Sequence, residues 1–233
     1  GLGDVYKRQE LGLRFDYQDA ESIHDLKQIP TLAVIATGAK TSETWHAKPQ
    51  AMDFFDFKGE IEEVLAAGRV QVEYVRSERS WLHPGQSAEV LVDGQSIGYF
   101  GRLHPSLEDA LDLSTTWVAE LDQSAVLQTY VSNFTELSRF PSVRRDIALL
   151  ISDKINVSEI QQLIEKTGGE LLDSTWLFDV YTGQGVEDGK RSLAFALLWQ
   201  HPSRTLEDAE IKSGMDHILQ VLENTYQATL RAS

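Results

Sequence analysis

The 233-residue sequence predicts an α+β protein with two domains. Along residues 30–127, short apolar and β-branched runs typical of strands are interrupted by a few helical repeats. Residues 139–233 give one strand–helix–strand–strand–helix–strand order, and the polar stretch 128–138 separates the two patterns. These observations predict an antiparallel α/β layer over residues 10–127, a linker over 128–138, and a compact two-layer domain over 139–233.

The first domain is predicted from its strands and turns. Alternation or a short apolar run marks the strands Leu32–Thr37, Val70–Val75, Ala88–Val92, Ser96–Phe100 and Thr116–Leu121. Asp93-Gly94 is a strong signal for a tight hairpin, and His83-Pro84-Gly85 is expected to form a turn. Helical spacing or a capping residue predicts the segments Asp19–Leu26, Gly59–Leu65 and Ser106–Leu111.

Residues 1–9, GLGDVYKRQ, differ in kind from the rest of the chain. DVYKRQ is the peptide that a transposon end used in sequencing-library preparation encodes when it is translated. We therefore interpret residues 1–9 as an adapter-derived scar and expect the natural protein to be longer.

The second domain begins with the apolar run Ile147–Ile151, which predicts a buried strand. Asn156 and Glu159 have the spacing of a capping box, and Gly168-Gly169 is expected to end the helix that they start. Trp176–Tyr181 and Leu193–Trp199 predict two strands, joined by the glycine-rich loop Thr182–Gly189.

A long helix comes next, with Thr205 as its predicted cap and an apolar 3–4 repeat at Ile211, Met215, Ile218 and Leu222. Gln227–Leu230 predicts a last strand. This β-α-β-β-α-β order is the ferredoxin-like arrangement, in which both helices cover one face of the sheet.

Composition limits the possible functions. The chain has no cysteine, and therefore no disulfide or thiolate chemistry. No apolar run approaches the roughly 20 residues that span a bilayer, so we expect a soluble, cytoplasmic protein without a membrane partner. The net charge is −15, which argues against a general nucleic-acid binder. Residues 1–137 carry net −11 and residues 138–233 only −4, so RNA contact would need a local basic face.

No motif for catalysis or for a cofactor is present. The six histidines lack metal-ligand spacing, there is no phosphate-binding Gly-x-x-x-x-Gly-Lys, and there is no nucleophile elbow. We expect no catalytic, cofactor-binding or metal-binding residue in this chain.

Three strings carry a resemblance to a known family. RRDIA, FDVYTGQGVEDGKRSLAF and SRTLEDAEI occur in that order and spacing, and LHPGQSAEVLVDGQSIGYFGRLHPSLEDALDL precedes them. Together they resemble the C-terminal end of the bacterial phenylalanyl-tRNA synthetase β subunit. The first domain resembles the end of its catalytic-like, inactive class II synthetase module, and the second resembles its ferredoxin-fold anticodon-binding domain.

The resemblance implies a fragment of an aminoacyl-tRNA synthetase that is not itself catalytic. Its expected partners are the synthetase α subunit and tRNA(Phe), within an (αβ)₂ heterotetramer. ATP and magnesium would serve the parent enzyme, where the α subunit attaches phenylalanine to its tRNA. Val75-Arg76-Ser77-Glu78 partly matches the Phe-Arg-x-Glu motif that class II synthetases use against ATP, but the third motif of that class is missing downstream.

Unpaired RNA bases are held by stacking and by hydrogen bonds to base edges, so the open sheet face of the second domain is the expected site. Alternation predicts that Phe195, Leu197 and Trp199 face the helices, whereas Ser192, Ala194 and Ala196 face outward. Trp176 and Phe178 are expected in the core. The residues that we expect to contact tRNA are Arg144, Arg145, Asp146, Asp179, Tyr181, Lys190, Arg191, Ser192, Ala194 and Arg204.

An alternative function comes from the same fold order. Domains of this order also bind amino acids between paired copies, so the second domain is alternatively an amino-acid-sensing regulatory module. Thermal stabilisation by phenylalanine, with none by tRNA, would favour that alternative.

Overall fold

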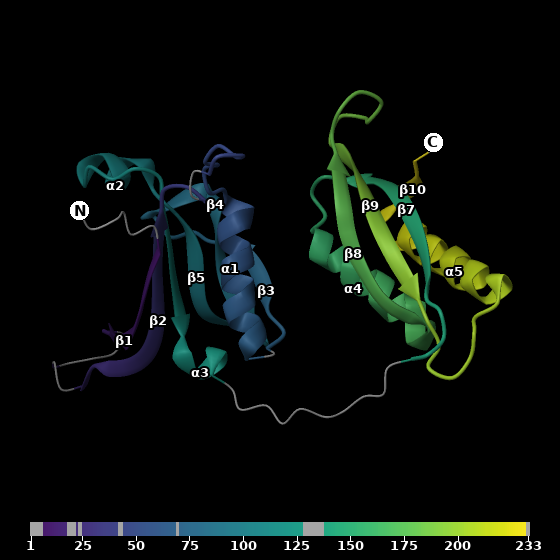
Figure 1. The fold of residues 1–233 in the computed structure, drawn as a ribbon, viewed down its shortest axis with the longest axis horizontal. Helices are drawn as coiled ribbons and strands as arrows, with labels where there is room; N and C mark the ends of the chain where they lie inside the picture. The colour runs from purple at the N-terminus through teal and green to yellow at the C-terminus, as the bar shows by residue number, and fades with distance from the viewer. Residues whose placement is uncertain are drawn as a thin grey trace. The chain divides into compact units, whose positions relative to one another are not determined.

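The computed structural model describes residues 7–17, 22, 25–41, 44–68, 70–127 and 138–231. The chain divides into two compact units, residues 1–132 and 133–233 (Figure 1). The predicted α+β class is confirmed, because both units contain an antiparallel sheet packed against helices.

The first unit is built on a six-stranded antiparallel sheet. Its elements in chain order are β1 (Lys7–Asp16), β2 (Lys27–Thr37), α1 (Phe54–Ala67), β3 (Glu73–Arg76), β4 (Leu82–Val92), β5 (Gln95–Leu103), α2 (Pro105–Ala110), β6 (Thr116–Asp122) and α3 (Gln123–Val126). The strand order is β1-β2-β6-β5-β4-β3. The predicted hairpin between β4 and β5 is present, with both Asp93 and Gly94 at positive φ as a tight primed turn requires.

Helix α1 covers one face of this sheet. Its buried residues Phe57, Ile61 and Leu65 lie in one cluster with Phe100 of β5 and Trp117 of β6. Asp53 begins the helix: its carboxylate accepts from the Asp56 N–H at 2.8 Å, and the Asp56 side chain accepts in return from the Asp53 N–H.

The second unit has the predicted ferredoxin-like arrangement. Its elements are β7 (Val143–Ser152), α4 (Val157–Gly168), the short 3-10 helix η2 (Gly169–Leu171), β8 (Leu172–Tyr181), β9 (Lys190–Trp199), α5 (Asp208–Tyr226) and β10 (Thr229–Leu230). The sheet order is β10-β7-β9-β8, all antiparallel, and Figure 1 shows α4 and α5 on the same side of it. Among the described residues of this unit, the other face of the sheet carries no helix.

The core of the second unit lies between the sheet and these two helices. Leu193, Phe195, Leu197 and Trp199 of β9 all belong to it, as predicted for the last three. Gly214 of α5 sits directly on the Trp199 ring, where an added Cβ would lie 2.5 Å from the indole. The period-two alternation of β9 therefore assigns Ser192, Ala194 and Ala196 to the open face.

Three element predictions were wrong or incomplete. β1 was not predicted; it spans Lys7–Gln9 of the interpreted scar as well as residues 10–16, and pairs with β2 over its whole length. His83-Pro84-Gly85 lies inside β4, where the pairing with β5 is irregular between Leu82 and Ser87, and is not a separate turn. The cap of α5 is Glu207, with Glu210 closing the box, so Thr205 lies outside the helix.

Asn156 is at the N-cap of α4, as predicted, but its side-chain amide donates to Glu159 at 2.7 Å and makes no bond to the backbone of the helix. Most of the predicted helix Asp19–Leu26, and all of the predicted linker except Ser138, lie outside the described residues. The domain boundaries at 10–127, 128–138 and 139–233 therefore stay a prediction.

Candidate nucleic-acid interface

The open face of the sheet in the second unit brings together six of the ten predicted contact residues. Ser192 and Ala194 project from β9, and the register places Tyr181 beside Ser192 and Asp179 beside Ala194. On the other flank, Arg144 pairs with Leu198, and Asp146 pairs with Ala196. Residues directly opposite each other in a ladder share a face, so these six side chains lie on one surface.

A β-bulge in β8 changes which aromatic residues reach this surface. Leu177 pairs with Phe195 and Asp179 with Ala194, so Phe178 is the extra residue between them. Trp176, opposite Ala196, is 39% exposed, and Phe178 is 48% exposed. The expectation that both rings pack in the core is therefore wrong, whereas for Trp199, which is 1% exposed, it is correct.

Arg144 connects the two exposed rings. Its guanidinium carbon lies 5.4 Å from the ring centroid of Trp176 and 5.3 Å from that of Phe178, within the range of cation–π contact. The same guanidinium donates to both carboxylate oxygens of Asp146, at 2.7 and 3.2 Å. This hydrogen bonding raises the pKa of Arg144 and neutralises its charge locally.

A second arginine–aromatic pair was missed by the sequence reasoning. The guanidinium carbon of Arg231 lies 4.6 Å from the ring centroid of Tyr181, and the Tyr181 hydroxyl donates to the Gln184 carbonyl at 3.2 Å. Arg231 follows β10 at one edge of the sheet and Tyr181 ends β8 at the other, so the pair reaches across the open face. No local pattern marks Arg231, because its position depends on how β10 pairs with β7.

The other four predicted contact residues are all cations; Lys190 shares the alternation phase of Ser192 at the end of β9, whereas Arg145, Arg191 and Arg204 do not join this face. Arg145 points to the helix side, where it donates to Asp208 beside α5 at 3.2 Å. Arg191 donates to the Ile155 carbonyl at 2.6 Å, Lys190 pairs with Glu187 in the hairpin, and Arg204 pairs with Glu210 at 2.6 Å. The Arg204 hydrogen bond lowers the pKa of Glu210 to about 2. These ion pairs and hydrogen bonds engage Arg145, Lys190, Arg191 and Arg204 within the unit, and their role as tRNA contacts stays a prediction.

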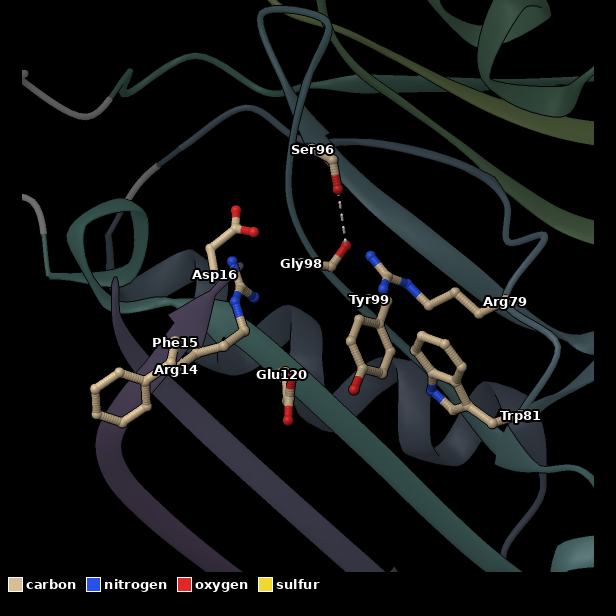
Figure 2. A pocket seen from close by; sticks show the side chains of 9 residues that line it. All are labelled: Arg14, Phe15, Asp16, Arg79, Trp81, Ser96, Gly98, Tyr99 and Glu120. Carbon is tan, nitrogen blue, oxygen red and sulfur yellow. Dashed lines mark hydrogen bonds between the residues drawn. The ribbon is translucent and has the colours of Figure 1, made fainter. Parts of the chain in front are cut away.

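The first unit holds a separate cavity on the sheet face opposite α1, of about 350 Å³ (Figure 2). The Arg79 guanidinium carbon lies 4.2 Å from the Tyr99 ring centroid and 5.3 Å from that of Trp81, and Arg79 donates to Glu89 at 2.6 Å. Burial, followed by the charge of Glu120, raises the pKa of Tyr99 to about 12, so the phenol stays protonated. No predicted site residue lies here.

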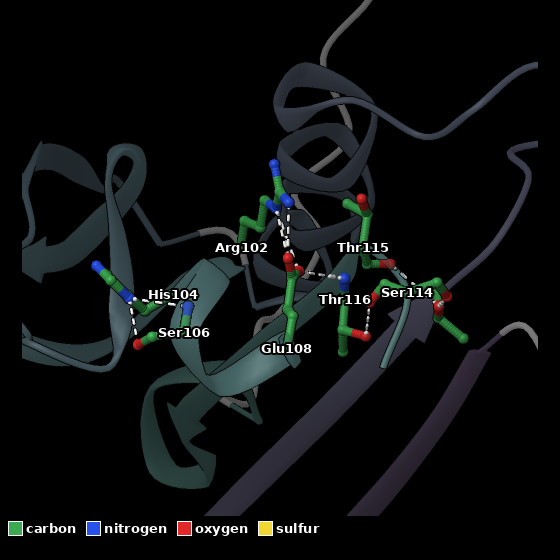
Figure 3. Close-up of polar contacts among 8 residues, drawn as sticks. Arg102, His104, Ser106, Glu108, Ser114, Thr115 and Thr116 are labelled. Atoms are coloured by element: carbon green, nitrogen blue, oxygen red, sulfur yellow. Dashed lines mark hydrogen bonds and ion pairs between the residues drawn. The ribbon is translucent and has the colours of Figure 1, made fainter. Parts of the chain in front are cut away.

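A buried ion pair in the first unit is structural. Glu108 of α2 accepts from Arg102 at 2.6 Å and from the Thr116 N–H at 2.8 Å, and so ties α2 to β5 and β6 (Figure 3). Within the residues that the structure describes, no group of three or more His, Asp or Glu is placed to hold a metal ion. Over the same residues, no helix is long and apolar enough to cross a membrane.

Two family models match this chain. The model described as phenylalanyl tRNA synthetase beta chain CLM domain matches residues 2–123, and the model described as ferredoxin-fold anticodon binding domain matches residues 138–231.

Curated relatives agree with both models. The phenylalanine–tRNA ligase beta subunit of Acinetobacter baylyi is 82% identical over 224 residues, which are 96% of this chain and 28% of the relative. The subunits of Psychrobacter arcticus and Bacillus subtilis are 42% and 39% identical, over 96% and 89% of this chain and 28% and 26% of their own lengths. The chain thus spans little more than a quarter of each of these relatives.

Proposed function

Because this chain belongs to the phenylalanyl-tRNA synthetase beta-chain family, we propose that its second unit binds the anticodon loop of tRNA(Phe). The observation that carries this proposal is the sheet face on which the described residues place no helix, where Tyr181, Ala194 and Asp179 lie beside the buried Ser192. Tyr181 offers a ring for stacking, and the exposed Asp179 offers hydrogen-bond acceptors for base edges, whereas Ser192 is buried beneath the face.

The charges on this face favour recognition of bases over a general attraction to phosphate. Arg144 is neutralised by Asp146, and the chain as a whole carries −15. A protein that neutralises many phosphates loses affinity steeply with salt. We therefore expect tRNA binding that is selective for the loop sequence and whose affinity falls only slightly with salt. Such binding suits a domain that recognises one loop while other parts of an enzyme hold the rest of the tRNA.

We assign the chemistry of the parent enzyme elsewhere. Phenylalanine would be attached to tRNA(Phe) by the α subunit with ATP and magnesium, in an (αβ)₂ heterotetramer in the cytoplasm, and no catalytic residue is expected in this chain. The first unit would supply contact surface for the α subunit. Leu11, Leu13 and Phe15 of β1, each more than half exposed, are apolar groups that such a contact would cover.

The test is binding of the full chain to a tRNA(Phe) transcript. We expect Tyr181→Ala to weaken binding about tenfold, from the ~1–3 kcal/mol that one base–aromatic stack contributes. Lys212→Ala, on the helix side, is the matched control and should bind as the unmodified chain does. Equal affinity for transcripts with a changed anticodon would contradict the proposal, and thermal stabilisation by phenylalanine alone would support an amino-acid-sensing module in its place.

A further inference from the structure

The Arg144 cluster, defined as Arg144, Asp146, Trp176 and Phe178, is a second built feature of the open face. Arg144 lies within cation–π distance of both rings, and Asp146 fixes its guanidinium with two hydrogen bonds. Each of these contacts restricts side-chain rotation, so the two rings and the guanidinium form a pre-ordered cluster. Pre-ordering reduces the entropy that a ligand must overcome on binding.

The exposure of these rings needs a physical reason. Trp176 and Phe178 leave 39% and 48% of their surfaces in water, although the same strand buries Thr175 and partly buries Leu177. Alternation along β8 puts Trp176 and Phe178 on the face opposite to Leu177, and the bulge at Phe178 brings Asp179 and Tyr181 to that same face. Neighbouring exposed rings of this kind mark a binding surface.

The local charge decides which ligand fits. A free arginine would attract phosphate or an acidic peptide, but both carboxylate oxygens of Asp146 already occupy Arg144. What stays available is the exposed part of the two rings, 39% of Trp176 and 48% of Phe178. Unpaired nucleic-acid bases stack on aromatic rings and on arginine planes.

The distance to Tyr181 is compatible with one continuous ligand. Trp176 lies opposite Ala196 and Tyr181 opposite Ser192, four residues apart on β9, or roughly 13 Å at ~3.3 Å per residue. The sheet surface between Trp176 and Tyr181 carries small side chains, because Ala194 lies there and pairs with Ala148 on one side and with Asp179 on the other. RNA-recognition motifs, which also have a four-stranded sheet, stack two or three bases on their aromatic residues.

We propose that the Arg144 cluster is a second base-stacking site, which takes an unpaired base of the same RNA loop that Tyr181 contacts. This inference rests on the proposed function, since it names further recognition residues on the same face. The two ends of the face, Tyr181 with Arg231 and the Arg144 cluster, then hold different nucleotides of one loop.

Substitution at Arg144 separates stacking from phosphate contact. Lysine keeps the charge and the ion pair with Asp146 but lacks the planar guanidinium. With an RNA hairpin that carries the anticodon loop of tRNA(Phe), we expect Arg144→Lys and Arg144→Ala to weaken binding by similar factors, about threefold or more. Recovery of full affinity by Arg144→Lys would overturn the stacking assignment.

Ring removal gives the second measurement. We expect Trp176→Ala and Phe178→Ala in the full chain each to weaken hairpin binding, by about tenfold for the larger ring. Phe55→Ala, which removes a still more exposed ring, 74%, from α1, is the control and should leave affinity unchanged. Photo-crosslinking with 4-thiouridine placed at each loop position should attach one position to Trp176 or Phe178 and a different position to the segment around Tyr181.

The outcomes distinguish the two proposals. If Tyr181→Ala weakens binding while the Trp176 and Phe178 variants bind normally, the proposal of a second stacking site is wrong and the proposed function stands. If the unmodified chain does not bind the hairpin, the proposed function fails as well. Thermal unfolding of each variant checks that a loss of binding does not come from a loss of folded structure. Cross-links from Trp176 or Phe178 to a protein partner, with none to RNA, would assign these rings to a protein interface.

Discussion

At the scale of single residues, Asp146 sets the electrostatic character of the open face. It accepts from the Nε and Nη2 edge of the Arg144 guanidinium, at 2.7 and 3.2 Å. We expect Asp146→Asn to free Arg144 for phosphate and to steepen the salt dependence of RNA binding by about 0.7 in the log–log slope, the value for one phosphate contact on a single strand. Titration at several salt concentrations measures this slope. A lower affinity with an unchanged slope would instead show that Asp146 contacts a base.

Glu108 gives a second prediction at the same scale, this time for stability. Its side chain is buried and accepts from Arg102 and from the Thr116 backbone, so Glu108→Gln should reduce the free energy of unfolding by about 1–3 kcal/mol. Asp109→Asn, exposed on the same helix, should have little effect.

The pH dependence of this effect comes from the hydrogen bond with Arg102, which holds the pKa of Glu108 below its ordinary value. A depressed carboxyl pKa means that the stabilisation is complete above the unfolded-state pKa of about 4.3 and is lost as the pH falls through the folded-state pKa. Thermal unfolding between neutral and acidic pH should show the gap between the unmodified chain and Glu108→Gln closing below about pH 4. A gap that stays constant would assign the effect to packing.

Residue identities in the sequence predicted much of the face but not all of it. Ser192 and Ala194 can be placed by simple alternation along β9, whereas the face of Tyr181 depends on the bulge in β8. Trp176 and Phe178 cannot be placed in this way, because aromatic residues in a strand are equally compatible with a core, and a bulge has no reliable signature in a single sequence. The ion pairs of Arg145, Lys190 and Arg204 depend on which elements meet in space, which charge counts do not reveal.

At the scale of elements, the bulge in β8 makes a testable prediction. Because Phe178 is the extra residue, deleting it restores regular pairing and leaves Trp176, Leu177 and Asp179 on their present faces. We expect the deletion variant to fold, to keep nearly the same melting temperature and to lose RNA affinity as Phe178→Ala does. Deletion of Val180 is the contrast, since it moves Tyr181 to the other face and should lower the melting temperature clearly.

The elements themselves were predicted where their pattern is local. The hairpin at Asp93-Gly94 and the end of α4 at Gly168 depend on residues that adopt special backbone conformations, and both were found. The start of α5 was predicted at Thr205 because threonine is a common N-cap residue. In the structure Glu207 is the N-cap, the Glu210 side chain accepts from the Glu207 N–H, and Arg204 donates to Glu210. β1 was missed although Leu11, Leu13 and Phe15 alternate with polar residues or glycine, because its first residues, Lys7–Gln9, are polar and its pairing partner β2 is not marked by a local turn signal.

At the scale of the whole molecule, the two units have separate hydrophobic cores. Phe195 is central to one and Phe100 to the other, and both are fully buried. Truncation of a buried phenylalanine to alanine costs about 3–5 kcal/mol. We expect calorimetry of the full chain to show two unfolding transitions, with Phe195→Ala lowering one and Phe100→Ala lowering the other. Movement of both transitions by either variant would show that the units unfold together.

The contrast between the two tryptophans of the second unit has an optical consequence. Trp199 is enclosed by apolar groups under Gly214, and its indole nitrogen has no hydrogen-bond partner among the described residues. Such an indole emits at short wavelength, and its emission moves to the red only when the interior opens. Trp176, partly in water beside a cation, emits further to the red and is open to quenching from outside. The second unit thus contains one intrinsic fluorophore that reports its folding and another that reports what touches its surface.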